Sequence, residues 1–202
     1  MQTFLRKMKI EHAYFLNPDV VAVARDLLGK YLFTMKNGQI SGGIISEVEA
    51  YKGINDRASH AFGGRRTQRN EMMFHEGGVA YVYLCYGMHH LLNFVTNVAD
   101  EPDAVLIRGV IPTHGTELML QRTGKPCAST NLTNGPGKVS KALAISVKDN
   151  GLDLCSDTLW VEDRGLVVKD DDVLITPRIG VDYAGPDAQR PYRFLLNPIS
   201  HP

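Results

Sequence analysis

The 202-residue sequence predicts one α+β domain over residues 1–202, built on a curved antiparallel β-sheet or open barrel with flanking helices and a protruding β-hairpin. Most apolar segments are short and are separated by glycine, proline and asparagine, which is typical of strands joined by turns. Helical spacing of apolar residues is confined to a few short segments. No internal repeat or low-complexity linker divides the chain, so a single domain is expected.

Composition and charge indicate an ordinary globular protein. Hydrophobic residues make up 44% and charged residues 22%. The 22 basic and 22 acidic residues cancel, so no overall field draws the protein to a polyanion. Charge is nevertheless uneven, with arginines gathered at 57–69 and three aspartates at 170–172. Local positive charge of this kind is sufficient for a nucleic-acid contact.

The cysteines and the N-terminus predict an intracellular protein. Three cysteines without close spacing favour a reducing compartment over a disulfide framework. Residues 1–14 lack the apolar core of a signal peptide and are expected to form a basic, loosely ordered arm. No segment approaches the ~20 apolar residues of a membrane span. We therefore expect a soluble protein without membrane contact.

The first helix and the first hairpin have clear start and turn signals. Asn17-Pro18-Asp19 resembles a helix start with Asn17 as N-cap, and Gly29 ends the apolar stripe that follows. Strands are expected at 30–35 and 40–51, joined by a turn at Asn37-Gly38. The second of these strands is expected to carry Glu47, Glu49 and Tyr51 out of the core on one face, because side chains two apart share a face.

The middle of the chain predicts a loop and a projecting hairpin. A glycine- and arginine-rich connection spans 53–69, with a helical turn near 56–62. Strands at 79–86 and 91–98 follow, and residues 86–89 form the tip between them. Further strands are expected at 104–111, 158–162, 173–177 and 192–196, and helices at 113–122 and 138–145. The glycine-rich start of the helix at 138–145 suits an anion.

Glu49 is the candidate general base. A glutamate on a strand face is usually only solvated, but in an aromatic-lined pocket it could activate water. Glu47 on the same face also permits the paired carboxylates of an O-glycosidase. The spacing alone does not choose between these interpretations.

Arg108 is the one charge in an otherwise apolar strand, 104–111. Burying an arginine without a partner costs roughly several kcal/mol, because its charge loses its hydration. It therefore forms a salt bridge with Glu47 or Glu49, orients a carboxylate or phosphate, or does both.

The aromatic and histidine residues also admit structural and functional interpretations. Tyr81 and Tyr83 fit sheet packing, whereas Tyr86 before Gly87 at the hairpin tip has little core to enter and suits a wedge in a base stack. The seven histidines show no recognised ligand spacing. Neither a metal nor a cofactor is expected.

Several motifs in order resemble one family, the alkyladenine (3-methyladenine) DNA glycosylases of the mammalian alkyladenine type. The resemblance covers about residues 15–200. The motifs are Val48-Glu49-Ala50-Tyr51, Ala58-Ser59-His60, Gly63-Gly64-Arg65-Arg66-Thr67, Arg69-Asn70, Met73-Phe74, Tyr81-Val82-Tyr83, Tyr86-Gly87-Met88, Asn93, Val105-Leu106-Ile107-Arg108, Gly135-Pro136-Gly137-Lys138, Arg178-Ile179-Gly180-Val181 and Arg193-Phe194.

The resemblance implies roles for individual positions. Glu49 resembles the base that deprotonates water, and Arg108 resembles the arginine beside it. The flipped base is expected between aromatic residues, with a wedge in the vacated stack and an asparagine that disfavours the exocyclic amine of guanine. The base-binding positions are Tyr51, His60, Tyr83 and Asn93; the DNA-binding positions are Tyr86 as the wedge, Met88, His89, Arg65, Arg69 and Lys138.

The implied activity is monofunctional removal of damaged purines from double-stranded DNA. The substrates would include 3-methyladenine and 7-methylguanine, with hypoxanthine and ethenoadenine left open, and the enzyme would act as a cytoplasmic, nucleoid-associated bacterial monomer, or in the nucleus of a eukaryote. His89 and the segment 52–57 depart from the family pattern. The alternatives are a carboxylate- or metal-dependent hydrolase of a non-DNA substrate and a non-catalytic nucleic-acid-binding module.

Overall fold

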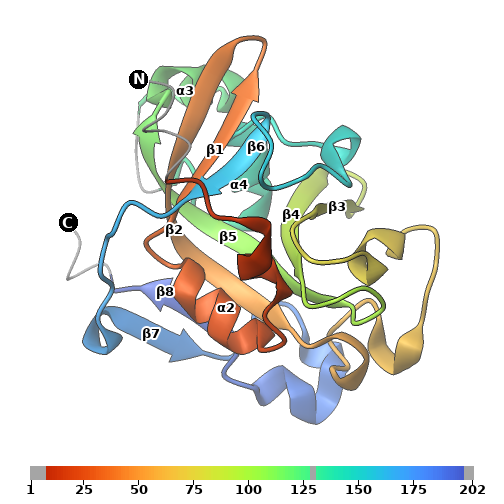
Figure 1. Cartoon of the computed structure of the whole chain (residues 1–202). Coiled ribbons are helices and arrows are strands. Elements are labelled where there is room, and N and C mark those ends of the chain that lie inside the picture. Colours follow the sequence, from red (N-terminus) through yellow and green to blue (C-terminus); the bar gives the residue numbers. More distant parts are fainter. Residues whose placement is uncertain (1–7, 128–130, 198–202) are drawn as a thin grey trace.

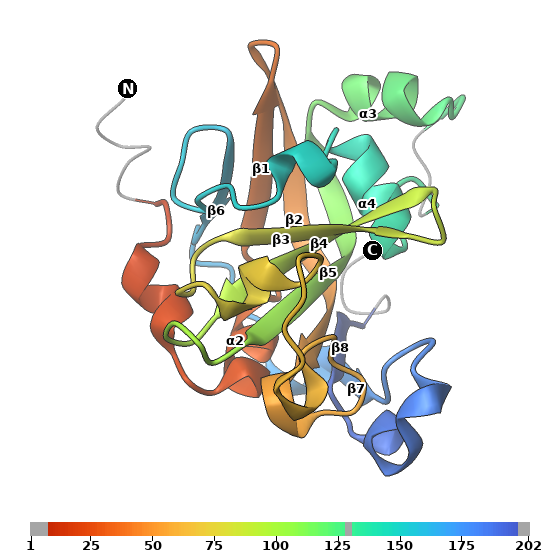
Figure 2. The same cartoon turned by 90° about the vertical axis from the view of Figure 1, so that its right-hand side faces the viewer.

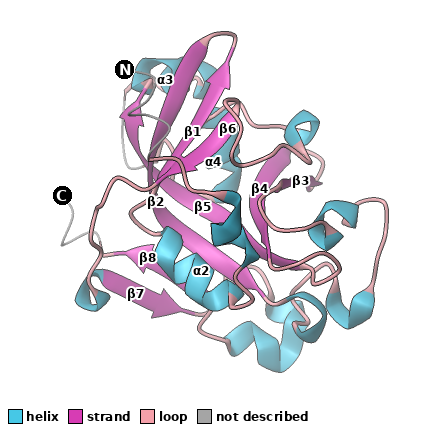
Figure 3. Ribbon diagram, viewed as in Figure 1, coloured by secondary structure: helices cyan, strands magenta, loops and turns pink. Residues whose placement is uncertain are grey.

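The computed structural model describes residues 8–127 and 131–197 (Figure 1). Eight strands form one antiparallel sheet, with the order β3-β4-β5-β2-β1-β6 and with β8 on β2 and β7 on β8. The sheet curls into a half-barrel with helices against it (Figure 3), which confirms the predicted α+β class. The strands are β1 (Tyr31–Lys36), β2 (Gln39–Tyr51), β3 (Ala80–Cys85), β4 (His89–Thr96), β5 (Asp103–His114), β6 (Leu159–Glu162), β7 (Val173–Thr176) and β8 (Arg193–Leu196).

Strand β2 is the central element, because it pairs with β1, β5 and β8. It starts at the predicted turn, where Asn37 and Gly38 have φ of 53° and 74°. Its bend requires glycine: a Cβ on Gly43 would lie 2.0 Å from the Ile111 oxygen. Register shifts beside Glu47 mark a bulge in the β2–β5 ladder. This bulge lies where the strand carries its two acids.

Among the described residues, three α-helices flank the sheet: α2 (Val20–Leu27), α3 (Thr116–Thr123) and α4 (Pro136–Ala142). Helix α2 buries Val20, Val23, Ala24 and Leu27. Its N-cap is Asp19, whose carboxylate accepts from two backbone N–H groups, so the prediction of Asn17 as N-cap was wrong. Asp19 provides the acceptor at the position where the chain enters helical geometry.

Two further expectations need correction. Residues 8–14 are not a loose arm: Ile10 is buried and its N–H donates to Val161 (2.9 Å), and a 3-10 helix spans His12–Leu16. Residues 1–7 lie outside the described residues.

Strand β5 runs on to His114, so α3 begins at Thr116 instead of 113.

The β3–β4 hairpin projects from the sheet, with its turn at 86–88 (Figure 2). No helix in the described part of the chain is long and apolar enough to cross a membrane.

Candidate active site

A cavity of about 460 Å³ opens between the β3–β4 hairpin, β5 and the loops at 58–60 and 179–183. Five tyrosines and His60 line it, together with aliphatic residues and a few polar groups. Such a cavity suits a flat ring with hydrogen-bonding edges. The predicted site residues that line it are Tyr51, His60, Arg69, Tyr83, Tyr86, Asn93 and Arg108.

Glu49 is fully buried and lies behind the cavity wall. The Tyr51 hydroxyl donates to its Oε2 (2.8 Å), and the Ile179 N–H donates to its Oε1 (2.8 Å). Arg108 Nη1 lies 3.4 Å from the same Oε1. Tyr51, Arg108 and Ile179 all line the cavity, so the carboxylate contacts three residues of the cavity wall. The expectation that β2 carries this acid out of the core was wrong.

Arg108 contacts both acids, which agrees with the salt-bridge alternative left open by the sequence. Its Nε donates to Glu47 Oε1 (2.8 Å), which also accepts from Arg193 Nε (2.7 Å). Burial opposes ionisation of Glu47, but the hydrogen bonds from Arg108 and Arg193 hold the pKa of this carboxyl below its ordinary value. Burial likewise opposes the charge on Arg108, but the Glu49 and Glu47 carboxylates raise its pKa. Glu47 thus remains an anion and supports the position of Arg108.

His60 and Tyr83 form one wall of the cavity together. Their ring centroids are 4.7 Å apart in an edge-to-face contact, and His60 Nδ1 lies 2.9 Å from the Tyr81 hydroxyl. Burial, with a smaller effect of Arg69 and Arg65, lowers the pKa of His60 to about 4. The imidazole is therefore neutral at physiological pH.

Asn93 lies on the floor of the cavity and is buried. Its Nδ2 donates to the Tyr81 carbonyl (3.1 Å). This bond fixes the side-chain amide in the cavity wall.

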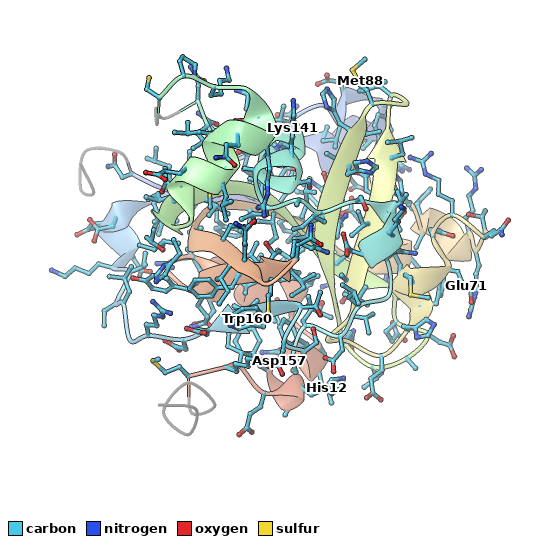
Figure 4. All side chains as sticks on the ribbon, turned by 90° about the horizontal axis from the view of Figure 1, so that it is seen from above. His12, Glu71, Met88, Lys141, Asp157 and Trp160 are labelled. Atoms are coloured by element: carbon cyan, nitrogen blue, oxygen red, sulfur yellow. The ribbon has the colours of Figure 1, made fainter. Side chains whose placement is uncertain are left out.

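The hairpin tip is the most exposed aromatic feature. Tyr86 has φ of 50° and is 91% exposed, and Met88 is 69% exposed. Figure 4 shows Met88 at the outer edge of the molecule. His89 is exposed and packs beside Gly137 of α4, where a Cβ would meet its ring at 3.0 Å. Tyr86 thus protrudes as a wedge would, and Met88 and His89 lie next to it.

The basic residues differ in their availability. Arg66 is held by Glu71 and Asp100, and Arg69 lies over the Tyr83 ring (5.2 Å). Arg65 is exposed, and no ion pair is recorded for it among the described residues. Lys138 is exposed on α4, with its Nζ 3.4 Å from Asn131 Oδ1. Arg65 and Lys138 are therefore free to meet an anion.

Two cavity residues with notable contacts or exposure, Ile179 and Tyr183, were given no role by the sequence. Ile179 supplies a backbone donor to Glu49, and backbone donors leave no compositional signal. Tyr183, 71% exposed at the cavity mouth, lies in a 3-10 segment (Asp182–Gln189) whose pattern predicts no element. Within the described residues, no three His, Cys, Asp or Glu side chains are grouped as a metal site.

An aromatic cavity backed by a buried carboxylate and flanked by an exposed hairpin tyrosine is typical of enzymes that act on a base taken out of a nucleic-acid stack. The family model for methylpurine-DNA glycosylases (MPG) matches residues 14–198. The chain belongs to this family, and it is therefore a DNA glycosylase, a hydrolase of DNA repair.

Curated bacterial relatives agree in length and sequence. A Chlamydia pneumoniae protein is 46% identical over 192 residues, which cover 94% of this chain and 95% of the relative. A Bacillus cereus protein (strain G9842) is 45% identical over an alignment of 199 residues. This alignment covers 93% of this chain and 95% of the relative. Each is named as a candidate 3-methyladenine DNA glycosylase. As a member of the methylpurine-DNA glycosylase family, this chain acts on DNA.

Proposed function

We propose that this enzyme flips alkylated purines out of duplex DNA and hydrolyses their N-glycosidic bond with a water activated by Glu49. The observation that carries the proposal is the set of groups around this carboxylate. Its two oxygens offer about four lone-pair sites. Tyr51 and Ile179 take two by hydrogen bonds, and Arg108 pairs with Oε1. A position on Oε2 remains for a water at the cavity wall.

The cavity favours cationic purines. We propose that the base lies between Tyr51 on one side and the joint wall of His60 and Tyr83 on the other. An alkylated purine carries positive charge, which aromatic faces attract. His60 is neutral at physiological pH, so it does not repel this charge. Asn93 is proposed to disfavour the exocyclic amine of guanine.

The proposed substrates are therefore 3-methyladenine and 7-methylguanine. Both are good leaving groups, so one general base suffices and no covalent nucleophile is required. Hypoxanthine and ethenoadenine are neutral and need protonation as they leave. The second carboxyl beside Arg108, Glu47, has a lowered pKa and is a poor acid. We propose that neutral lesions are removed more slowly.

DNA contact is proposed to follow the hairpin and its neighbours. Tyr86 would fill the vacated stack, with Met88 and His89 in the minor groove. Arg65, Arg69 and Lys138 would contact phosphates. We further propose that the enzyme acts as a monomer on the bacterial nucleoid.

The test is incubation of the protein with methylated duplex DNA in excess chelator, followed by analysis of free bases and alkali-labile sites. We expect free 3-methyladenine and 7-methylguanine together with abasic sites. Binding without base release would indicate a non-catalytic DNA-binding module. Release that stops in chelator would indicate a metal-dependent hydrolase instead.

A further inference from the structure

Behind the cavity wall lies a buried ion pair between Arg178 and Asp56. Both side chains are fully buried, and the pair is bidentate, with Arg178 Nη1 on one carboxylate oxygen and Nη2 on the other (2.8 Å). Asp56 also accepts from the Lys52 N–H (3.1 Å) and the Ala58 N–H (3.0 Å). The carboxylate thereby holds the loop that follows β2. Neither partner lines the cavity.

The same guanidinium contacts the groups that hold Glu49. It lies 4.8 Å from the centre of the Tyr51 ring, and its Nη1 donates to the Ala50 carbonyl (2.9 Å). Residue 179, next in the chain, supplies the backbone donor to Glu49. Arg178 therefore touches the ring of one donor and precedes the other in sequence.

We infer that the Arg178–Asp56 pair is a positioning unit that sets the two hydrogen bonds to Glu49, one from the Tyr51 hydroxyl and one from the Ile179 N–H. The inference rests on the hydrolytic role proposed for Glu49. Without the pair, the C-terminal loop and the end of β2 lose their common anchor. The carboxylate then loses its fixed direction toward the water position. Displacement of about 1 Å far from the reacting atoms can lower a rate by roughly 100-fold.

The main test is Arg178→Lys. Lysine keeps the charge but cannot reproduce the planar, two-pronged contact or the stacking on Tyr51. We expect the single-turnover rate of 3-methyladenine release, at saturating enzyme, to fall by about 10- to 100-fold. The Kd for duplex carrying an abasic-site analogue should change less than about threefold, because this analogue presents no base to Tyr51. Asp56→Asn is the second variant, in case Arg178→Lys does not fold.

Arg164→Lys is a matched control. Arg164 also bonds to a carboxylate, Glu162 (2.8 Å), and lies over two rings, Tyr31 (4.6 Å) and Phe33 (4.8 Å). None of these residues lines the cavity. Arg164 is partly exposed, so this variant should lower Tm by less, and it should leave the single-turnover rate unchanged. A rate loss equal to that of Arg178→Lys would overturn the inference, because the effect would then follow stability alone.

Coupling to Tyr51 separates positioning from general damage. If Arg178 acts through the Tyr51 hydroxyl, Tyr51→Phe should cost less rate in the Arg178→Lys background than in the wild type. Additive losses, or a wild-type rate in both Arg178→Lys and Asp56→Asn, would overturn the inference while leaving base release by the wild type intact. Failure of the wild type to release any base would instead overturn the proposed function.

Discussion

Glu49 is a fully buried acid whose polar partners all come from the protein. Moving an isolated carboxylate out of water costs roughly several kcal/mol. Here two hydrogen bonds and the Arg108 charge replace water. Strand alternation correctly predicted that Glu47, Glu49 and Tyr51 share a face, since all three belong to the cluster around Arg108 and Glu49. The burial could not be predicted, because residues of the C-terminal region, 178–196, supply the cover.

Tyr86 provides a test at the hairpin tip. Its backbone is left-handed and its ring is solvated, so Tyr86→Asn, which tolerates that conformation, should leave Tm unchanged. Loss of the wedge should weaken binding to lesion-containing duplex by about 1–3 kcal/mol, measured by fluorescence anisotropy. Val167→Ala, at an exposed apolar position of another loop, is the control. Unchanged affinity in Tyr86→Asn would exclude the wedge role.

Asp103 provides a test of stability against pH. Burial raises the pKa of this carboxyl to about 6, against 3.8 ordinarily. The folded state thus holds the proton more tightly, so the stabilisation is complete below pH about 3.8 and is lost as pH rises through 6. Asparagine at this position is always neutral. Above pH 6, Asp103→Asn should therefore raise the free energy of unfolding by at most about 3 kcal/mol, measured by denaturant unfolding. The gain should vanish near pH 3.8; a pH-independent effect would contradict this explanation.

At the scale of elements, the bulge between β2 and β5 orients the acids. A Cβ on Gly109 would lie 2.8 Å from Ser46 Oγ and 2.9 Å from Glu47 Cβ. Gly109→Ala should therefore shift Glu47 and Arg108, lowering the free energy of unfolding by about 1–3 kcal/mol and slowing base release. The measurements are urea unfolding and single-turnover kinetics.

Gly38→Ala is the control for that prediction. Gly38 has φ of 74° with nothing within 4 Å of its Cβ position. The variant should lose stability through backbone strain alone, about 1 kcal/mol, without slowing base release. Slower release in Gly38→Ala than in Gly109→Ala would contradict the role of the bulge.

Most strands were predictable because alternation and turn residues are local signals. Asn37-Gly38 and the β3–β4 hairpin are examples. The start of α3 was predicted too early because β5 continues past Pro112 to His114 by pairing with β2, at the register Gly42–His114. The order in which strands join the sheet, with β8 on β2, depends on contacts distant in sequence and left no local signal.

For the whole molecule, zero net charge predicts weak long-range attraction to DNA, so phosphate contacts depend on a few free cations. Arg65 and Arg66 are adjacent, but only Arg66 is neutralised by Glu71 and Asp100. Arg65→Ala should reduce the slope of log Kd against log salt by about 0.9, measured on undamaged duplex. Arg66→Ala should reduce it by less. Equal slopes would show that the Arg66 ion pairs open on DNA.

The central claim is that Glu49 activates the water, and its most direct test is the single-turnover rate of 3-methyladenine release from duplex DNA by Glu49→Gln. Glu47→Gln, a neighbouring change on the same arginine, is the matched control. We predict a loss of at least about 100-fold for Glu49→Gln and a much smaller loss for Glu47→Gln, with lesion-DNA binding retained in both. Release by Glu49→Gln at nearly the wild-type rate would contradict the claim.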